Sequence, residues 1–412
     1  MGGLARMPYY QRIQSVNGLL RYWPINEASG TTVTDISTAK NNIASGYSSV
    51  TLAQPGIGDS NTCGLWTNPG SYASVYSAAL AAAQPGNEGT LAVWVKASDV
   101  AIWNDTVTLT ILRYRCAGGN EYIGLYKYGT GYVAAVYRAA GVSRTFTQRQ
   151  KAGGWLLLTL AWSNAGNLVT FDVNGIQVSA AQASPGAWGD TVTGVYVGAQ
   201  TDGSSASNWS GWLAHAMLFN RALTQLERRN LFDWRQPGKR LTVIGDSISS
   251  AAVNTDWPVV IANTYNSGVC GYWTHAVSGN TIMSHFDTQT AEAANDQASV
   301  IICELGTNDD NAGDMGALQA KVESNLAALR SSNAGAPIYY MNVLPRWTDT
   351  GGGTPVDKGN IRTAIAAACT AQGVTCWDTF TTPWITAAQT ADGLHPTAAG
   401  DAAIAAEVLA RI

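Results

Sequence analysis

The run LTVIGDSIS at residues 241–249 constrains the fold more than any other part of the chain. Its apolar and β-branched residues predict a buried strand that stops at Gly245, Asp246 and Ser247. Glycine permits a sharp turn there, which would lift Ser247 out at the carboxyl edge of a sheet, where ligands bind in open α/β folds. A serine at that edge suits nucleophilic attack if a base can reach it. Taken alone, Gly-Asp-Ser is more typical of a strand-to-helix turn in which the serine caps a helix.

Beyond residue 240, apolar runs alternate with alanine-rich helical stretches, which is the pattern of a parallel α/β sheet. Further strands are predicted at 269–277, 300–305, 337–343 and 374–377, and helices at 257–263, 315–330, 358–371 and after Pro396. Residues 241–412 are therefore expected to form a three-layer α/β sandwich.

Polar residues follow several of these predicted strands. Ser247 follows the first, Gly279 the second and Asn308 the third, and Asp392 and His395 come after the last. In a parallel sheet these ends share one edge, so a nucleophile, a base, a carboxylate and oxyanion donors can converge. Asp392 and His395 are three residues apart and would share a face on a helical turn.

These four blocks in this order resemble the SGNH (GDSL-type) hydrolase family over roughly residues 240–412. The resemblance implies that Ser247 is the nucleophile, His395 the general base and Asp392 the carboxylate that orients the imidazole. It also implies an oxyanion hole built from the backbone N–H groups of Ser247 and Gly279 and the side-chain amide of Asn308.

The first half of the chain predicts an antiparallel β-sandwich. Strand-like runs occur at 19–23, 31–35, 89–96, 155–162, 168–173, 176–178, 194–198 and 214–219. Asn174-Gly175, between two such runs, is a strong hairpin signal because both turn positions need positive φ. Residues 18–30 and the closing run into Thr224, a candidate helix N-cap, resemble laminin-G-like (concanavalin A-like) jelly-roll domains. That resemblance implies a carbohydrate-binding module, while a spacer or oligomerisation domain is an equal alternative.

We therefore predict a lead-in at 1–17, the sandwich at 18–234, a linker at 235–240 around Pro237-Gly238, and the hydrolase domain at 241–412. Lys and Arg outnumber Asp and Glu by four before residue 237, whereas acidic residues exceed basic ones by eight after it. An acidic second half disfavours nucleic acid as a partner. No stretch is apolar enough to span a membrane, and the first residues do not read as a signal peptide.

Neither a metal nor an organic cofactor is expected. The six cysteines contain no Cys-x-x-Cys pair, which argues against zinc and leaves their redox state undecided, and no tight acidic cluster indicates calcium. His215, His275 and His285 are assigned structural or surface roles. Asp246 is expected to tie the turn to neighbouring loops, and Asp309 to lie in a solvated turn. Trp273, Trp347 and Trp384 are candidates for stacking on a sugar ring, with the core as the equal alternative.

The sequence thus predicts a serine esterase that removes short acyl groups, foremost O-acetyl, from carbohydrate. One alternative is a lysophospholipase or thioesterase. Another is an adhesion or receptor-binding protein, extracellular or carried on a virion, in which esterase activity is secondary. The oligomeric state is not indicated by any feature of the sequence.

Overall fold

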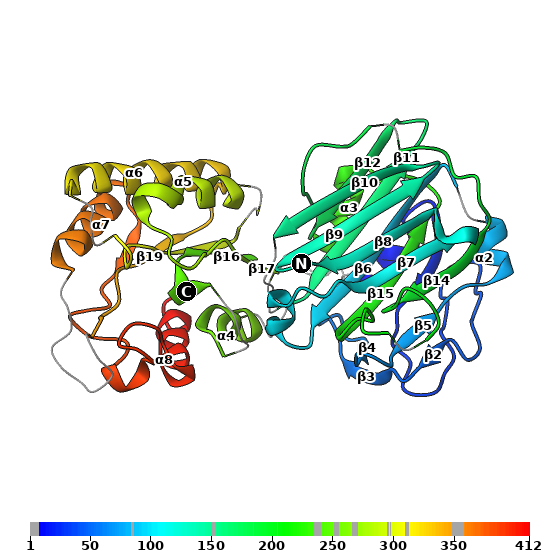
Figure 1. Cartoon of the computed structure of the whole chain (residues 1–412), viewed down its shortest axis with the longest axis horizontal. Coiled ribbons are helices and arrows are strands. Elements are labelled where there is room, and N and C mark those ends of the chain that lie inside the picture. The colour runs from blue at the N-terminus through cyan, green and yellow to red at the C-terminus, as the bar shows by residue number, and fades with distance from the viewer. Residues whose placement is uncertain are drawn as a thin grey trace, which may run out of the picture. The chain divides into compact units, whose positions relative to one another are not determined.

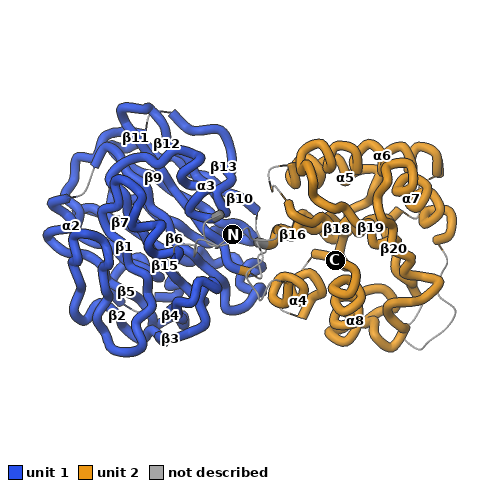
Figure 2. Tube along the Cα trace, turned by 180° about the vertical axis from the view of Figure 1, so that it is seen from behind, with its two compact units in different colours: residues 1–150, 155–238 blue, residues 151–154, 239–412 orange. Residues whose placement is uncertain are grey.

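A computed structural model of the chain divides into two compact units. Unit 1 comprises residues 1–150 with 155–238, and unit 2 comprises 151–154 with 239–412 (Figure 2). The structure describes residues 8–83, 86–149, 154–183, 185–203, 205–233, 240–250, 255–265, 271–294, 296, 298–309, 313–347 and 358–412. Of the predicted linker, residues 235–239 lie outside this described part, and Arg240 already begins a strand.

Unit 1 is an antiparallel β-sandwich of two sheets, as predicted (Figure 1). The eight-stranded sheet has the order β13-β12-β11-β6-β15-β4-β3, and β1 pairs with β15. Its strands are β1 (Leu19–Trp23), β3 (Thr51–Pro55), β4 (Thr62–Trp66), β6 (Glu88–Ala97), β11 (Leu156–Ser163), β12 (Leu168–Val173), β13 (Ile176–Gln177) and β15 (Gly211–Phe219).

The second sheet of unit 1 has seven strands in the order β10-β9-β8-β7-β14-β5-β2. They are β2 (Tyr47–Ser48), β5 (Tyr72–Ser74), β7 (Leu109–Cys116), β8 (Tyr122–Tyr128), β9 (Tyr132–Ala139), β10 (Val142–Arg149) and β14 (Val192–Val197). Short helical segments connect the strands: α2 (Ala78–Ala83), η1 (Val100–Asn104) and η2 (Ala117–Gly119).

Local signals in unit 1 mostly predict the right structure. Asn174 and Gly175 have φ of 54° and 75° and join β12 to β13 as the predicted hairpin. Thr224 caps α3 (Gln225–Asp233): its hydroxyl accepts the Glu227 N–H, and the Glu227 carboxylate accepts the Thr224 N–H.

The predicted strand at 31–35 is wrong. Only an isolated bridge joins Val33 to Ile43 in this segment. Asp35 instead accepts backbone N–H groups from Tyr22, Ser37 and Asn41. A buried carboxylate that collects local N–H groups offers the backbone an alternative to a strand ladder, which the alternation of residue types does not reveal.

The segment before Gly18, predicted as a lead-in, contains helix α1 (Tyr9–Gln14), whose Tyr9 and Ile13 are buried in the sandwich core. The Tyr9 hydroxyl donates to the Leu231 carbonyl at 2.8 Å and accepts from Trp94 Nε1 at 2.8 Å. At six residues the helix is too short to show a periodic pattern, so tertiary contacts define it.

Unit 2 has one parallel sheet with the order β17-β16-β18-β19-β20. The strands are β16 (Arg240–Gly245), β17 (Gly271–Thr274), β18 (Val300–Glu304), β19 (Ile338–Met341) and β20 (Thr375–Trp377). The helices are α4 (Trp257–Thr264), α5 (Ile282–Ala293), α6 (Met315–Ser332), α7 (Gly359–Ala371) and α8 (Ala398–Leu409), with short turns η3 (Ser247–Ser249) and η4 (Ala387–Gln389).

Helices α5, α6 and α7 cover one face of this sheet, and α4 and α8 lie together on the other (Figure 1). The side of the sheet covered by α5, α6 and α7 has a core of apolar side chains that include Phe286, Leu326 and Ile365. The predicted strands and the helices α4, α6, α7 and α8 are present, whereas the sequence pattern does not indicate α5. Because all five strands run parallel, their carboxyl ends share one edge of the sheet.

Candidate active site

The turn after β16 is built on Gly245. A Cβ at this position would lie 2.6 Å from Ser249 Cβ and 2.8 Å from the Glu304 carbonyl oxygen, so only glycine fits. Asp246 follows and accepts the Ile248 N–H on Oδ1 at 3.0 Å, which starts the single turn η3. The turn presents Ser247 as a half-buried side chain just beyond the strand.

A chain of hydrogen bonds leads away from Ser247. His395 Nε2 lies 2.9 Å from Ser247 Oγ, and His395 Nδ1 lies 2.7 Å from Asp392 Oδ2. The structure therefore brings together three residues that the sequence singles out, although 148 positions separate Ser247 from His395. Because an ionised carboxylate can only accept, Nδ1 carries its proton toward Asp392, and Nε2 is left to accept from the serine hydroxyl.

Asp392 is held ionised by its own loop. Its partial burial opposes ionisation, but hydrogen bonds from the backbone N–H and side chain of His395 and from the Leu394 N–H lower the pKa of Asp392 to about 2. Asp392 and His395 side chains are about half exposed, so this side of the site is open to solvent. Trp347 supports the same loop by donating its N–H to the Gly393 carbonyl at 2.7 Å.

The predicted oxyanion donors lie on two loops that are tied together. Asn308 Nδ2 donates to the Asn280 carbonyl at 3.0 Å, and an amide nitrogen carries two hydrogens, so one remains for another acceptor. Gly279 is exposed with φ of 79°, and no atom lies within 4 Å of the place that a Cβ would occupy, which leaves its surface open. Among the residues that the structure describes, neither Gly279 nor Asn308 is hydrogen-bonded to Ser247.

Asp309 is not in a solvated turn, contrary to the prediction. It is buried and accepts the N–H groups of Ile282 and Met283 at the start of α5. This helix, which the sequence does not reveal, therefore anchors the loop that carries Asn308. Burial raises the pKa of Asp309 despite these hydrogen bonds.

Two buried carboxyl groups lie beneath the serine turn. Gly245 and Glu304 are paired in neighbouring strands, and both Asp246 and Glu304 are fully buried. Burial raises the pKa of Asp246 to about 6, and burial and the neighbouring Asp246 raise the pKa of Glu304 well above its usual range. Two adjacent buried acids cannot both ionise cheaply, and this repulsion adds to burial in raising the pKa of Glu304. Asp246 is expected from the sequence to tie the turn to neighbouring loops, but its side-chain partner is Glu304 at the end of β18.

Trp257 links the serine turn to the helix that follows His395. Its Nε1 donates to the Ile248 carbonyl at 3.1 Å, and its backbone N–H donates to Asp401 Oδ1, on α8, at 3.0 Å. Burial raises the pKa of Asp401 to about 7. Sequence reasoning missed both residues because the partners of Trp257 are 9 and 144 positions away.

The three candidate tryptophans do not offer open ring faces. Trp273 lies in β17 with 1% exposure, and Trp347 and Trp384 are also buried. Trp384 packs against Trp377 and lies beneath the Arg411 guanidinium. These contacts support the alternative interpretation of the sequence, in which the three tryptophans are core residues.

The other histidines have structural partners. His275 Nε2 lies 2.7 Å from Asp296 Oδ2 and its Nδ1 lies 3.1 Å from Glu292 Oε2. Although burial alone would lower it, these two carboxylates raise the pKa of His275 to about 9. His215 contacts Tyr22 and Asp59 inside the sandwich, and His285 accepts the Thr281 N–H.

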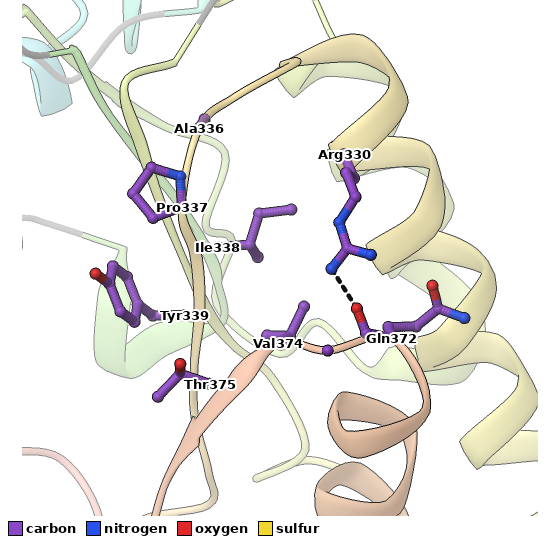
Figure 3. A pocket seen from close by; sticks show the side chains of 9 residues that line it. Arg330, Ala336, Pro337, Ile338, Tyr339, Gln372, Val374 and Thr375 are labelled. Atoms are coloured by element: carbon purple, nitrogen blue, oxygen red, sulfur yellow. Dashed lines mark hydrogen bonds between the residues drawn. The ribbon is translucent and has the colours of Figure 1, made fainter.

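A cavity of about 410 Å³ lies at the opposite edge of the same sheet (Figure 3). It is lined where β19 and β20 begin, by residues that include Pro337, Ile338 and Thr375, and the Arg330 guanidinium beside it donates to the Gln372 carbonyl. Since Ser247 stands beyond the carboxyl end of β16, this cavity belongs to a different part of unit 2.

Within the described residues, no group of three or more His, Cys, Asp or Glu side chains is arranged to hold a metal ion. Cys63, Cys116, Cys303, Cys369 and Cys376 are free thiols, and Cys270 lies outside the described part. None of the described helices is long and apolar enough to cross a membrane.

Unit 2 combines a parallel α/β sheet with a hydrogen-bonded Ser247–His395–Asp392 arrangement. Residues 243–403 match the GDSL-like Lipase/Acylhydrolase family, and residues 67–227 match the Concanavalin A-like lectin/glucanases superfamily. The chain thus joins a laminin-G-like domain to a GDSL-like hydrolase domain of the esterase/lipase type, in the predicted order.

Several solved structures are similar to parts of the chain. The crystal structure of TesA is 18% identical, with 42% of this chain covering 97% of that chain at a TM-score of 0.34. The receptor binding domain of botulinum neurotoxin C/D mosaic serotype is 10% identical, with 53% of this chain covering 51% of that chain at a TM-score of 0.40. Trypanosoma rangeli sialidase in complex with a difluoro-KDN ligand is 16% identical, with 53% of this chain covering 33% of that chain at a TM-score of 0.40.

The chain therefore spans about half of the toxin domain and a third of the sialidase. Similarity at this level does not identify an activity. No curated protein matches the chain.

Proposed function

We propose that this protein hydrolyses short acyl esters, foremost O-acetyl groups on carbohydrate, through an acyl intermediate on Ser247. The observation that carries the proposal is the continuous hydrogen-bonded chain from Ser247 Oγ through His395 to Asp392. A nucleophile, a base and a group that orients the base are the arrangement that acyl transfer requires.

In the first step, Ser247 Oγ attacks the ester carbonyl carbon while its proton moves to His395 Nε2. The negative charge that develops on the carbonyl oxygen is stabilised by the N–H groups of Ser247 and Gly279 and by the second hydrogen of Asn308 Nδ2. Asp392, ionised because its pKa is about 2, stabilises the imidazolium through Nδ1.

The intermediate then collapses, the C–O bond to the alcohol breaks, and the alcohol leaves with the proton from His395. Water next gives a proton to His395 and attacks the acyl-serine carbon. Collapse of this second intermediate releases the carboxylic acid and returns the proton to Ser247. No outside oxidant or reductant is needed.

Two observations favour a short acyl group on a polar substrate. In the described part of unit 2, Met283 is the one exposed large apolar side chain, which gives a long acyl chain little surface to bind. The hydrolase half also carries an excess of acidic residues, which disfavours anionic lipid surfaces. The concanavalin A-like domain on the same chain supports carbohydrate as the carrier of the ester.

The test is an acyl-chain-length series of chromogenic esters, run beside acetate release from acetylated polysaccharides with Ser247→Ala as the blank. We expect kcat/KM to be highest for acetyl esters and acetate to be released from the polymer. A maximum at long acyl chains or at thioesters would favour the lysophospholipase or thioesterase alternative. Tight glycan binding without turnover would favour the adhesion alternative.

A further inference from the structure

The seven-stranded sheet of unit 1 has an unusual charge distribution. Its strands, all within the described residues, contain no Asp or Glu, yet they carry five arginines and one lysine: Arg113, Arg115, Arg138, Arg144, Arg149 and Lys127. The chain as a whole is acidic, with a formal net charge of −4. A basic sheet on an acidic protein is a local feature that creates a field for a negatively charged ligand.

The alternation along each strand separates the two faces of this sheet. In β8, Ile123, Leu125 and Lys127 are fully buried on the sandwich side, so Tyr122 and Tyr128 stand on the outer side. The arginines follow the same alternation. Their cross-strand partners place Arg113, Arg115 and Arg138 on the outer side. In β10, Arg144 lies between two exposed outer positions and therefore belongs to the opposite side of the sheet.

On the outer side, arginines and tyrosines are direct cross-strand neighbours. Arg115 pairs with Tyr122 and Tyr122 pairs with Arg138, so one tyrosine is flanked by two guanidinium groups. In the next row Arg113 pairs with Tyr196, and its guanidinium lies 4.5 Å from the centre of the Tyr122 ring. We call Arg113, Arg115, Tyr122, Arg138 and Tyr196 the arginine–tyrosine face. These residues lie on β7, β8, β9 and β14, which are labelled in Figure 1.

Glycines keep this face flat. Gly124 and Gly194 are outward positions with no side chain, and a Cβ on them would lie 2.2 Å from the Tyr126 hydroxyl oxygen and 2.4 Å from the Tyr196 ring. The tyrosine rings therefore lie along the sheet over the glycines. At the end of β8 and β9, the paired Tyr128 and Tyr132 are 50% and 39% exposed, which extends the aromatic surface into solvent.

The guanidinium groups are not neutralised by the protein. Within the described residues, Arg113, Arg115 and Arg138 form no salt bridge, and Arg113 Nε is buried with no hydrogen-bond partner. The nearby Glu121 is fully used by the N–H groups of Ala140, Gly189 and Asp190. Three guanidinium groups that share one face without a carboxylate partner form a place where an external anion can accept charge-assisted hydrogen bonds.

We propose that the arginine–tyrosine face binds an acidic polysaccharide, with sugar carboxylates on its three arginines and sugar rings against Tyr128 and Tyr132, the exposed tyrosines on the same side of the sheet. Strand spacing places Arg115 and Arg138 roughly 10 Å apart, and Arg113 roughly 7 Å from Arg115 along β7. A patch of this size matches a few sugar units. A nucleic-acid surface would instead show a longer basic stripe over much of the domain. The face belongs to unit 1 and Ser247 belongs to unit 2, and the inference does not depend on the proposed hydrolysis.

The experiment measures binding of the full chain to de-esterified polygalacturonate, a polyuronate with no acyl group to hydrolyse, by titration calorimetry at low and high salt. Dextran serves as the neutral polymer. We expect binding to polygalacturonate that weakens as salt increases and no binding to dextran. The double variant Arg115→Gln/Arg138→Gln should weaken binding about tenfold or more, because two charge-assisted contacts are lost.

Arg144→Gln is the matched control. It removes the same charge from the same sheet but from a position off the arginine–tyrosine face, so its affinity should stay within about twofold of wild type. Cooperative thermal unfolding of each variant shows that it is folded. Equal weakening by Arg144→Gln, binding to dextran, no binding to polygalacturonate at low salt, or equally tight binding to a single-stranded DNA oligonucleotide would each overturn the proposal. Loss of ester hydrolysis with polygalacturonate binding intact would instead count against the proposed function alone.

Discussion

The Ser249 hydroxyl, two residues beyond Ser247, donates a buried hydrogen bond of 2.9 Å to Glu304 Oε2. Asp246, on the other side of Ser247, accepts the Ile248 N–H and lies against the same Glu304. The turn that presents the serine is thus fastened on both sides to one buried carboxyl group in the neighbouring strand. This arrangement connects protonation of a buried acid to the stability of the site.

The first prediction concerns Glu304→Gln. The pKa of Glu304 is higher in the folded state than in the unfolded state. The contribution of Glu304 to stability is therefore complete at pH values below its unfolded-state pKa and decreases as the pH rises above that value. Glutamine keeps the acceptor for Ser249 but cannot lose a proton. The unfolding free energy of Glu304→Gln relative to wild type should therefore increase between about pH 5 and 8, by up to about 1.4 kcal/mol per pH unit.

Denaturant titrations across this pH range measure the effect. Glu304→Ala is the control and should be less stable than wild type, since the buried Ser249 hydroxyl would lose its acceptor. Parallel stability curves for wild type and Glu304→Gln would show that Glu304 does not hold the proton.

The second prediction concerns the nucleophile. Ser247→Ala removes the attacking oxygen and leaves the backbone of the turn unchanged, so turnover should fall to background with thermal unfolding close to that of wild type. A fluorophosphonate should label wild type at Ser247 and leave the variant unlabelled, as read by peptide mass spectrometry. Retained esterase activity in Ser247→Ala would rule out the acyl-serine route.

The third prediction concerns Asn308→Ala. The variant loses a donor that acts on charge developing in the transition state, so kcat should fall on the order of 10²–10³-fold with a much smaller change in KM. Steady-state kinetics on a soluble acetyl ester provide both constants. A raised KM at unchanged kcat would assign Asn308 to substrate binding.

The fourth prediction concerns Asp392 and pH. With a pKa of about 2, Asp392 stays ionised at every working pH, so the pH profile of kcat/KM should show no ionisation of Asp392 and should reach a plateau. Asp392→Asn should lower the plateau itself by about 10²-fold or more, because the amide cannot stabilise the imidazolium and permits the wrong tautomer. A variant that recovers the wild-type rate at high pH would contradict this role.

The fifth prediction concerns the two units. We propose that each has its own core, because each is compact by itself and contains its own sheets. A chain that begins at Lys239 should fold and hydrolyse small acetyl esters at close to the full-length rate. On acetylated polymer it should be slower, because the sandwich no longer holds it near the substrate. Insolubility, or inactivity on small esters, would indicate a shared core.

The sequence by itself determined the elements whose signals are local. The apolar run before Gly245, the Asn174-Gly175 turn and the Thr224 cap each follow from a few adjacent residues, and the structure contains all three. The same holds for the order of the strand ends, because parallel strands must bring their carboxyl ends to one edge. These local signals and the order of the strand ends are sufficient to select Ser247, Asp392 and His395.

Only the tertiary structure decided which side chains are buried and what they contact. Burial turned Trp273 from a candidate platform into a core residue, and it raised the pKa of Glu304 beneath the serine turn. Helix α1 and the Trp257 bridge depend on partners 222 and 144 positions away, which no short window of sequence contains. Local patterns fix the backbone conformation of a segment, whereas pKa values, exposed faces and long-range hydrogen bonds depend on neighbours that only the folded chain brings together.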